Sequence, residues 1–154
     1  LLLLSHDLSA QIPAPTRPTR RAQRSDWPHI LDIDASAFSQ FWQFDAISLT
    51  EAIKATPRSR VRVNTGPSPQ GFAITGRSGR QGFLQRLAVH PIHQGSGLGR
   101  ALVADALRWL QKRRVYEVLV NTQIENVTAL ELYESTGFVQ RNDGLAVLRW
   151  DATR

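Results

Sequence analysis

The stretch from Leu87 to Leu110 constrains the fold of this chain more than any other part of the sequence. It starts as an apolar run that ends at Val89 and breaks at Pro91. After a loop with three glycines it resumes with apolar residues at helical spacing. This pattern predicts a strand, a glycine-rich turn and the start of a helix. The first amides of such a helix have no intrahelical partner, and glycines let a bulky anion approach the backbone, so a phosphate-bearing ligand is expected.

The loop itself reads Gln94-Gly95-Ser96-Gly97-Leu98-Gly99. A dinucleotide fingerprint needs a third glycine where this chain has Arg100, and a P-loop needs a Lys-Ser or Lys-Thr pair that does not follow. The loop instead resembles the Gln/Arg-x-x-Gly-x-Gly/Ala signature of the GNAT acetyltransferase superfamily, in which this loop holds the pyrophosphate of acetyl-coenzyme A. A glycine-rich connection without a ligand is the alternative interpretation of the loop alone.

A second motif follows one apolar run later, from Asn126 to Phe138. It resembles the Asn-x-x-Ala-x-x-x-Tyr-x-x-x-Gly-Phe helix of the same superfamily, and its Asn126, Ala129 and Tyr133 share one helical face. The two motifs together imply the GNAT fold. In that α/β (α+β) fold a central mixed, mostly antiparallel sheet contains a splayed parallel strand pair and is flanked by about four helices.

The sequence order predicts one such domain over residues 19–151, with residues 1–18 as a proline-rich tail or linker. The chain contains no methionine, so we interpret it as a processed chain or as the later part of a longer one, with 1–18 as a remnant of a preceding domain. Helices are expected near 26–37 and 45–55. Strands are expected near 19–23, 58–64, 71–75, 83–89 and 115–120, and a closing hairpin is expected over 138–150 with its turn at 142–144.

Composition limits the classes of function. The 154 residues suffice for one domain with a core of its own, and the absence of cysteine excludes disulfides and thiolate catalysis and suits a cytoplasmic protein. The net charge of +6 is concentrated near 17–24 and 112–114 without a nucleic-acid-binding motif. We therefore expect a solvated basic surface and no nucleic-acid partner. We also expect neither a transmembrane helix nor a signal peptide.

The resemblance implies a set of residues that bind acetyl-coenzyme A. The strand before the loop would pair its backbone with the pantetheine arm, the loop amides would hold the pyrophosphate, and the second motif would meet the arm from the other side. These residues are Leu87, Ala88, Val89, Gln94, Gly95, Ser96, Gly97, Leu98, Gly99, Arg100, Asn126, Ala129 and Tyr133. His90 and His93 lack a third ligand at a suitable spacing, so no metal site is predicted.

Acetyl transfer to an amine needs a neutral amine and a proton donor for the departing thiolate. The resemblance gives the donor role to Tyr133. Where relatives carry a glutamate on the strand before the loop, this chain has Gln85, so Glu117 or a water held by Asn121 is the candidate base. Without a strong base the site favours an α-amine, since about a tenth of it is neutral at pH 7 against roughly a thousandth of a lysine.

The resemblance implies that the connection between the first two helices walls the acceptor side, and a hydrophobic plug under a loop is the alternative interpretation of its aromatic residues. That connection is rich in aromatic residues, and we assign the acceptor to Phe38, Phe41 and Trp42, together with Gln85. Two functions follow from the sequence: an acetyl-coenzyme A-dependent N-acetyltransferase acting on a peptide or small amine, and a non-catalytic acyl-coenzyme A-binding or partner module on the same fold. The sequence leaves open a homodimer or a covalently attached preceding domain as further partners.

Overall fold

The computed structural model describes residues 1–142, which form a seven-stranded mixed sheet and four α-helices. The strands are β1 (Leu2–His6), β2 (Thr19–Arg21), β3 (Arg58–Asn64), β4 (Gly71–Ser78), β5 (Gln81–Val89), β6 (Glu117–Thr122) and β7 (Val139–Gln140). The helices are α1 (Trp27–Ala37), α2 (Ala46–Lys54), α3 (Leu98–Lys112) and α4 (Val127–Ser135). The mixed α/β class is confirmed, and so are the predicted helices and strands before residue 142, to within a few residues.

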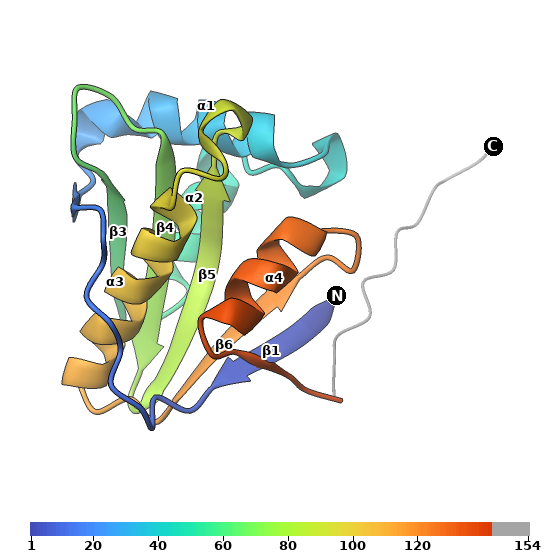
Figure 1. The fold of residues 1–154 in the computed structure, drawn as a ribbon. Helices are drawn as coiled ribbons and strands as arrows, with labels where there is room; N and C mark the ends of the chain where they lie inside the picture. The colour runs from blue at the N-terminus through green and yellow to red at the C-terminus, as the bar shows by residue number, and fades with distance from the viewer. Residues whose placement is uncertain (143–154) are drawn as a thin grey trace.

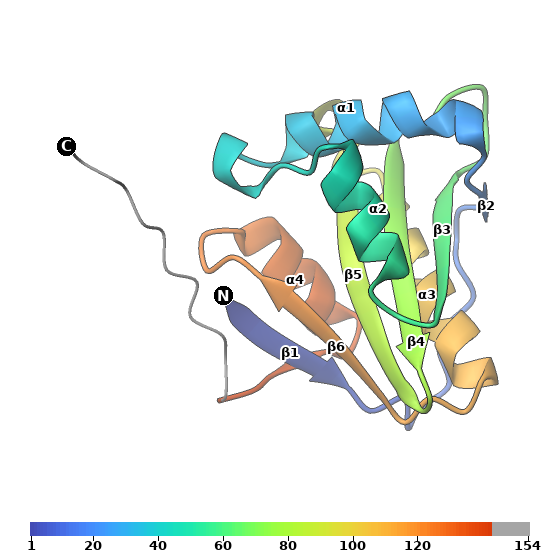
Figure 2. The same cartoon turned by 180° about the vertical axis from the view of Figure 1, so that it is seen from behind.

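The helices cover the two faces of the sheet in pairs (Figures 1 and 2). One core lies between α1, α2 and strands β3 to β5, and its fully buried residues include Ile30, Val63, Phe72 and Ile74. The other core lies under α3 and α4 and contains the apolar stripe of α3, in which Leu98, Leu102, Ala106 and Leu110 recur at helical spacing. The sheet is therefore the middle of three layers.

Helices α2 and α4 begin where the sequence supplies capping side chains, whereas α1 has Pro28 in its first turn and no side-chain cap. The Asp45 carboxylate accepts a hydrogen bond from the Ser48 amide at 2.7 Å, and the Asn126 side chain accepts one from the Ala129 amide at 3.2 Å. The longest helix, α3, differs because its N-cap is Gly97, whose φ of 85° requires no side chain. The absence of a capping side chain at the start of α3 is thus a local consequence of the glycine-rich loop.

The strand order is β2-β3-β4-β5-β6-β1-β7, and every neighbouring pair is antiparallel except β5 and β6. These two parallel strands pair at three positions, from Gln81 opposite Glu117 to Phe83 opposite Leu119. Beyond Phe83 the strands separate, as the diverging ribbons in Figure 1 show. The predicted splayed parallel pair is confirmed.

The prediction of a tail over residues 1–18 is wrong. Leu2–His6 forms strand β1, which pairs along its whole length with β6 and through Leu4 and Ser5 with β7. Leu4 is fully buried in the core under α3 and α4. The four leucines at the start of the chain carried an apolar signal, but nothing local in the sequence indicates that a strand between β6 and β7 comes from the opposite end of the domain.

Residues 7–18, which we call the strap, run from β1 along α3 to β2. Two residues of the strap, Leu8 and Ile12, are buried in the core under α3 and α4. Side chains of α3 hold its backbone: Gln111 donates to the carbonyls of Leu8 and Ala10 at 3.1 and 2.9 Å, and Arg108 donates to that of Ile12 at 3.0 Å. The strap is an integral part of the fold. The predicted hairpin strand at 145–150 lies outside the described residues.

His6 fixes the junction between β1, the strap and α4. Its Nε2 lies 3.1 Å from the carbonyl oxygen of Thr136 and its Nδ1 accepts a hydrogen bond from the Leu8 amide at 3.0 Å. A Cβ on Gly137 would lie 2.7 Å from the ring, so glycine is required there for close approach as well as for its φ of 103°. Burial lowers the pKa of His6, against the opposing effects of the Thr136 carbonyl and Asp7.

We predict that the protein loses stability as the pH falls below about 6.5, the pKa of an unperturbed histidine. Because the folded-state pKa of His6 is lowered, the unfolded chain binds more protons in this range, and unfolding becomes more favourable. A proton on Nδ1 would also break the bond from Leu8. The urea midpoint of the wild type at pH 7.5 and 5.5 tests this, with His6→Gln as the control in which this contribution to the pH dependence disappears. An equal midpoint shift in both proteins would contradict the assignment.

Candidate active site

A cleft of about 690 Å³ opens where β5 and β6 separate. One wall is formed by the end of β5 and the glycine-rich loop, the other by α4, and the end of α1 closes one side. Of the residues predicted from the sequence to bind the cofactor or substrate, the cleft brings together Phe38, Leu87, Ala88, Val89, Gln94, Gly95, Gly97, Gly99, Arg100, Asn126, Ala129 and Tyr133. Residues from four separate segments therefore meet at one opening in the sheet.

The loop presents backbone amides to the cleft. Gly95 and Gly97 have φ values of 80° and 85°, a region that disfavours residues with a side chain, and space for an added Cβ is open at both. Among the described residues no side chain caps the start of α3, so its first-turn amides remain free for an anion. The partial positive charge of a 15-residue helix adds to this preference. Leu98 is fully buried and anchors the loop in the core.

Polar side chains around the loop fix its shape. Gln94 donates to the carbonyl of Val89 at 3.1 Å, which ties the loop back to the end of β5. Arg100, in the first turn of α3, donates to the Ser135 hydroxyl of α4 at 2.8 Å. At Gly99 a Cβ would lie 3.0 Å from Leu132 of α4, so this glycine serves the close approach of the two helices.

The end of β5 has a free edge. Residues 84–89 pair with β4 on one side, and within the described chain no strand pairs with them on the side of β6. Leu87, Ala88 and Val89 lie in this part and line the cleft. Unpaired strand edges present backbone donors and acceptors to any extended ligand that contains amides.

Tyr133 lies at the base of the cleft and is only 4% exposed. Its ring packs edge-on against Phe138, with 5.6 Å between ring centres. Burial raises the pKa of Tyr133 well above its ordinary value, against the opposing charge of Arg86. The phenol therefore keeps its proton throughout the neutral and moderately alkaline range and can act as a donor.

The opposite face of β5 carries a buried cation that sequence reasoning missed. Arg86 donates to both carboxylate oxygens of Asp34 in α1, at 2.8 and 3.0 Å, and to the carbonyl of Trp42 at 2.6 Å. Its guanidinium lies between the rings of Phe38 and Phe44, 3.7 and 3.8 Å from their centres. Arg86 thus fastens the α1–α2 connection to the strand beside the cleft.

A β-bulge in β5 turns the Arg86 side chain toward α1, which the alternation of residues along the strand does not predict. Ile74 pairs with Arg86 and Thr75 pairs with Leu84, which leaves Gln85 as the extra residue. Leu84 belongs to the core under α3, whereas Arg86, two residues later, faces α1. Simple alternation would have placed the two side chains on one face. Gln85 does not line the cleft, and its amide lies near Gly76.

The remaining aromatic residues of the predicted acceptor wall lie beside Phe38. Phe41 and Trp42 form a short 3-10 turn (Gln40–Trp42) and pack edge to face, with 4.8 Å between ring centres. Phe41 is 46% exposed. They extend the aromatic surface outward from the cleft without lining it.

Two candidates for the base have different positions. Glu117 begins β6 opposite Gln81, roughly 20 Å along the strand from Leu87. It forms an ion pair with Arg141 at 3.5 Å and does not line the cleft, so its assignment as base is corrected. Asn121 lies beyond the last β5–β6 pair and alternates with the buried Val120, which places it exposed on the α1–α2 face at the opening. Asn121 remains a candidate for holding a water.

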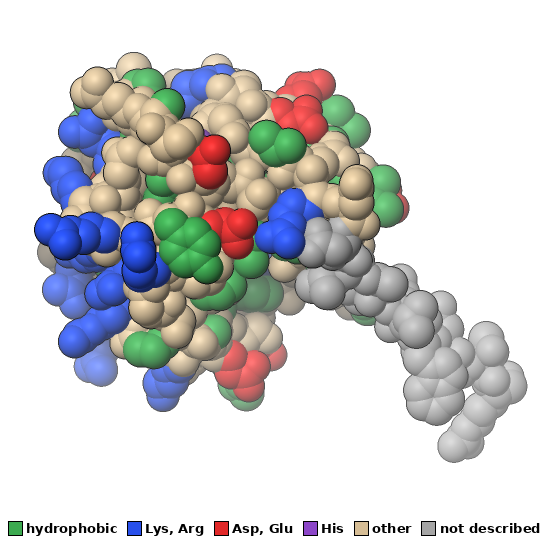
Figure 3. Space-filling view, turned by 90° about the horizontal axis from the view of Figure 1, so that it is seen from below, with side chains coloured by type: hydrophobic (Ala, Val, Ile, Leu, Met, Phe, Trp, Pro, Cys, Tyr) green, Lys and Arg blue, Asp and Glu red, His purple; other side chains and the backbone are tan. Residues whose placement is uncertain are grey.

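The basic surface lies mainly away from the cleft. Lys and Arg side chains gather on one part of the lower face in Figure 3, where α3 ends, β3 begins and β4 turns into β5. The exposed basic residues of these segments are Arg58, Arg80, Lys112, Arg113 and Arg114. The glycine-rich loop is at the other end of α3.

Within residues 1–142 no group of His, Asp and Glu could hold a metal ion. None of the helices in this part of the chain has the length and apolar character of a membrane span.

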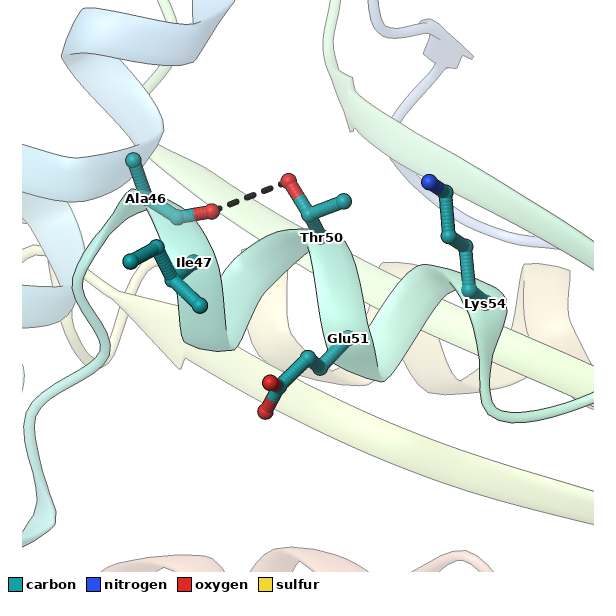
Figure 4. Close-up of a pocket in the computed structure, with 5 residues that line it drawn as sticks. All are labelled: Ala46, Ile47, Thr50, Glu51 and Lys54. Carbon is teal, nitrogen blue, oxygen red and sulfur yellow. Dashed lines mark hydrogen bonds between the residues drawn. The ribbon is translucent and has the colours of Figure 1, made fainter.

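A second depression lies on the outer side of α2 (Figure 4). It has a volume of about 520 Å³ and is lined by Ala46, Ile47, Thr50, Glu51 and Lys54. The Thr50 hydroxyl donates to the Ala46 carbonyl at 2.9 Å, and Ile47 is 70% exposed. All five residues belong to one helix, so this depression lacks the convergence of segments that marks the cleft.

The fold and the cleft define a class of protein in which a mixed sheet parts beside a helix with uncapped first-turn amides and a buried tyrosine. Within that class the chain belongs to the family described as Acetyltransferase (GNAT) family, whose model matches residues 26–138. The matched region contains both sequence motifs and every residue of the cleft, so the predicted family is confirmed.

The chain is similar to several named acetyltransferases. It is 44% identical to a mycothiol acetyltransferase of Acidothermus cellulolyticus over 75 residues, which are 46% of this chain and 23% of that protein. It is 40% identical to the [ribosomal protein bS18]-alanine N-acetyltransferase of Escherichia coli K12 over 67 residues, 44% of this chain and 45% of that protein. The chain thus matches less than half the length of either relative.

Several solved structures are similar over most of both chains. The crystal structure of the ribosomal-protein-S18-alanine N-acetyltransferase from Escherichia coli superposes with a TM-score of 0.71 and 26% sequence identity. The match covers 82% of this chain and 80% of that one.

We predict that Asp34→Ala lowers the free energy of unfolding by about 3 to 5 kcal/mol, because it leaves the Arg86 guanidinium buried without its counter-charge. Asp32→Ala, an exposed carboxylate in the same helix, serves as the matched control, with a change below about 0.5 kcal/mol. Urea denaturation of both variants measures the difference. Equal stability of the two would show that the ion pair does not hold the α1–α2 connection.

Proposed function

We propose that this chain is an acetyl-coenzyme A-dependent N-acetyltransferase that transfers the acetyl group to a primary amine within a ternary complex. The observation that carries the proposal is the meeting, at one opening of the sheet, of free helix amides, a free strand edge and a buried protonated tyrosine. These three features suit the three parts of the co-substrate: the diphosphate, the amide-containing arm and the thioester.

The loop amides from Gly95 to Gly99 hold the pyrophosphate in this proposal, and Leu87 to Val89 offer their free backbone edge to the pantetheine arm. Asn126, Ala129 and Arg100 line the cleft and complete the walls around the arm. The pantetheine arm then runs along the free edge of β5, from the glycine-rich loop toward Tyr133. The fit rests on backbone geometry, which supports a ligand rich in phosphates and amides.

The chemistry requires one nucleophilic attack and two proton movements. The neutral amine nitrogen bonds to the thioester carbonyl carbon, the carbon–sulfur bond breaks, and the sulfur leaves with the electron pair. Tyr133 then gives its proton to the thiolate, while the proton of the amine passes to water. Glu117 lies at the end where β5 and β6 are still paired, too far from the cleft to take this proton. In this proposal Asn121 instead holds the accepting water at the α1–α2 face of the sheet.

The acceptor in this proposal is an α-amine that approaches from the side of Phe38 and Arg86. In this proposal no carboxylate takes the proton of the amine, so transfer depends on acceptors that lose their proton unaided, and α-amines have a pKa of about 7.7 to 8.0. The similarity to a protein named for the alanine of a ribosomal protein supports this choice. The similarity to a mycothiol acetyltransferase makes a small amine the second acceptor to test.

We predict that Tyr133→Phe lowers kcat about 100-fold or more and leaves the Kd for coenzyme A nearly unchanged, because only the proton donor is removed. The matched control is Tyr116→Phe, which removes the hydroxyl of a tyrosine that is 57% exposed on the surface. Acetyl-coenzyme A consumption with α-amine peptides and small amines gives kcat, and calorimetry gives Kd. A wild-type chain that binds coenzyme A but acetylates none of these amines would favour the non-catalytic binding module.

We predict that kcat/KM for an α-amine peptide rises with pH up to about 8 and then stays level to about pH 10. The rise follows deprotonation of the amine, and the plateau follows from the raised pKa of Tyr133, which keeps the phenol protonated. The pH profile of kcat/KM tests this. A decline between pH 8 and 10 that is absent in Tyr133→Phe would contradict the protonated-tyrosine assignment.

A further inference from the structure

The strap brings a basic residue from the N-terminal segment to the glycine-rich loop. Gln111 and Arg108 hold the strap against α3, and Leu8 and Ile12 are buried beneath it. Three prolines, at positions 13, 15 and 18, limit the freedom of its second half. At its end the Nη1 of Arg17 donates to the hydroxyl of Ser96 at 2.9 Å. Arg17 is therefore held beside the loop by a strap that the last turns of α3 anchor.

Ser96 acts as the connection between Arg17 and the loop. Its hydroxyl donates to the carbonyl of His93 at 2.6 Å and accepts the bond from Arg17. Its neighbours Gly95 and Gly97 line the cleft, whereas Ser96 and Arg17 lie outside that lining. The guanidinium thus contacts the loop through Ser96, outside the residues that line the cleft.

The charge of Arg17 is not balanced by a carboxylate. Within residues 1–142 it forms no ion pair, while Arg20, Arg60, Arg62, Arg86 and Arg141 each have an acidic partner. Arg17 is partly buried, so its position is more defined than that of a freely exposed arginine. A positioned guanidinium without a counter-charge, beside a loop that already favours anions, is suited to a phosphate group.

We propose that Arg17 binds the 3′-phosphate of coenzyme A. This inference rests on the proposed function, since the ligand must occupy the loop. In this proposal the amides on the cleft side hold the pyrophosphate, and the ribose with its 3′-phosphate continues past the loop to the side of Arg17. The N-terminal segment, which lies outside the matched family region of 26–138, would then contribute directly to co-substrate binding.

The test compares two ligands that differ only in this phosphate. Calorimetry with the full chain gives Kd values for coenzyme A and for 3′-dephospho-coenzyme A. Arg17→Ala is expected to weaken coenzyme A binding about five- to tenfold and to leave the binding of dephospho-coenzyme A unchanged. Arg24→Ala removes the same charge from an exposed arginine of the short turn before α1 and is expected to change neither Kd by more than about twofold.

The comparison separates the possible failures. Coenzyme A that does not bind to the wild type would overturn the proposed function and this inference with it. Wild-type binding with equal affinity in Arg17→Ala would overturn this inference alone. A loss that is the same for both ligands would place the contact at the pyrophosphate and overturn the assignment to the 3′-phosphate. Because the two Kd values are compared within each variant, a general effect of the substitution on folding cancels, and Arg17→Gln repeats the test with a polar side chain.

Discussion

The separation of β5 from β6 is the constraint on which the rest of the site depends. Three pairs of residues join the strands, and beyond Phe83 and Leu119 each backbone continues without the other. A parallel pair that ends in this way leaves unpaired donors and acceptors inside the sheet, which would be costly unless another chain or ligand used them. The cleft forms at that place, and its walls are the free edge of β5, the start of α3 and one face of α4.

The two faces of the sheet contribute different chemistry at this opening. The α3–α4 side supplies amides, Arg100 and the protonated Tyr133. The α1–α2 side supplies a rigid aromatic surface, because the buried pair of Arg86 and Asp34 ties the connection between the helices to β5. A co-substrate seated from one side and an amine arriving from the other would meet where the strands part, which is the geometry that direct transfer requires.

Sequence patterns predicted the local structure around the cleft well where each residue's conformation follows from its neighbours in the chain. The glycine-rich loop and the helix from Asn126 to Tyr133 both form as expected, since turn chemistry and helical spacing are local. The patterns failed where the pairing register between strands decides which way a side chain faces. Arg86 faces α1 only because Gln85 is bulged, and Glu117 lies far from the cleft only because it pairs with Gln81. Neither pairing leaves a trace in the order of residues along one strand.

The sequence by itself therefore determined the family, the loop that favours an anion and the tyrosine that faces the opening, because these depend on short-range geometry. The tertiary structure alone decided that the first strand of the chain fills a place between β6 and β7, and that the strap carries Arg17 to the loop. Those arrangements depend on contacts between residues far apart in the sequence, such as His6 and Thr136, which are 130 positions apart. Local propensity does not encode such pairings, and the shared burial of distant apolar residues selects them.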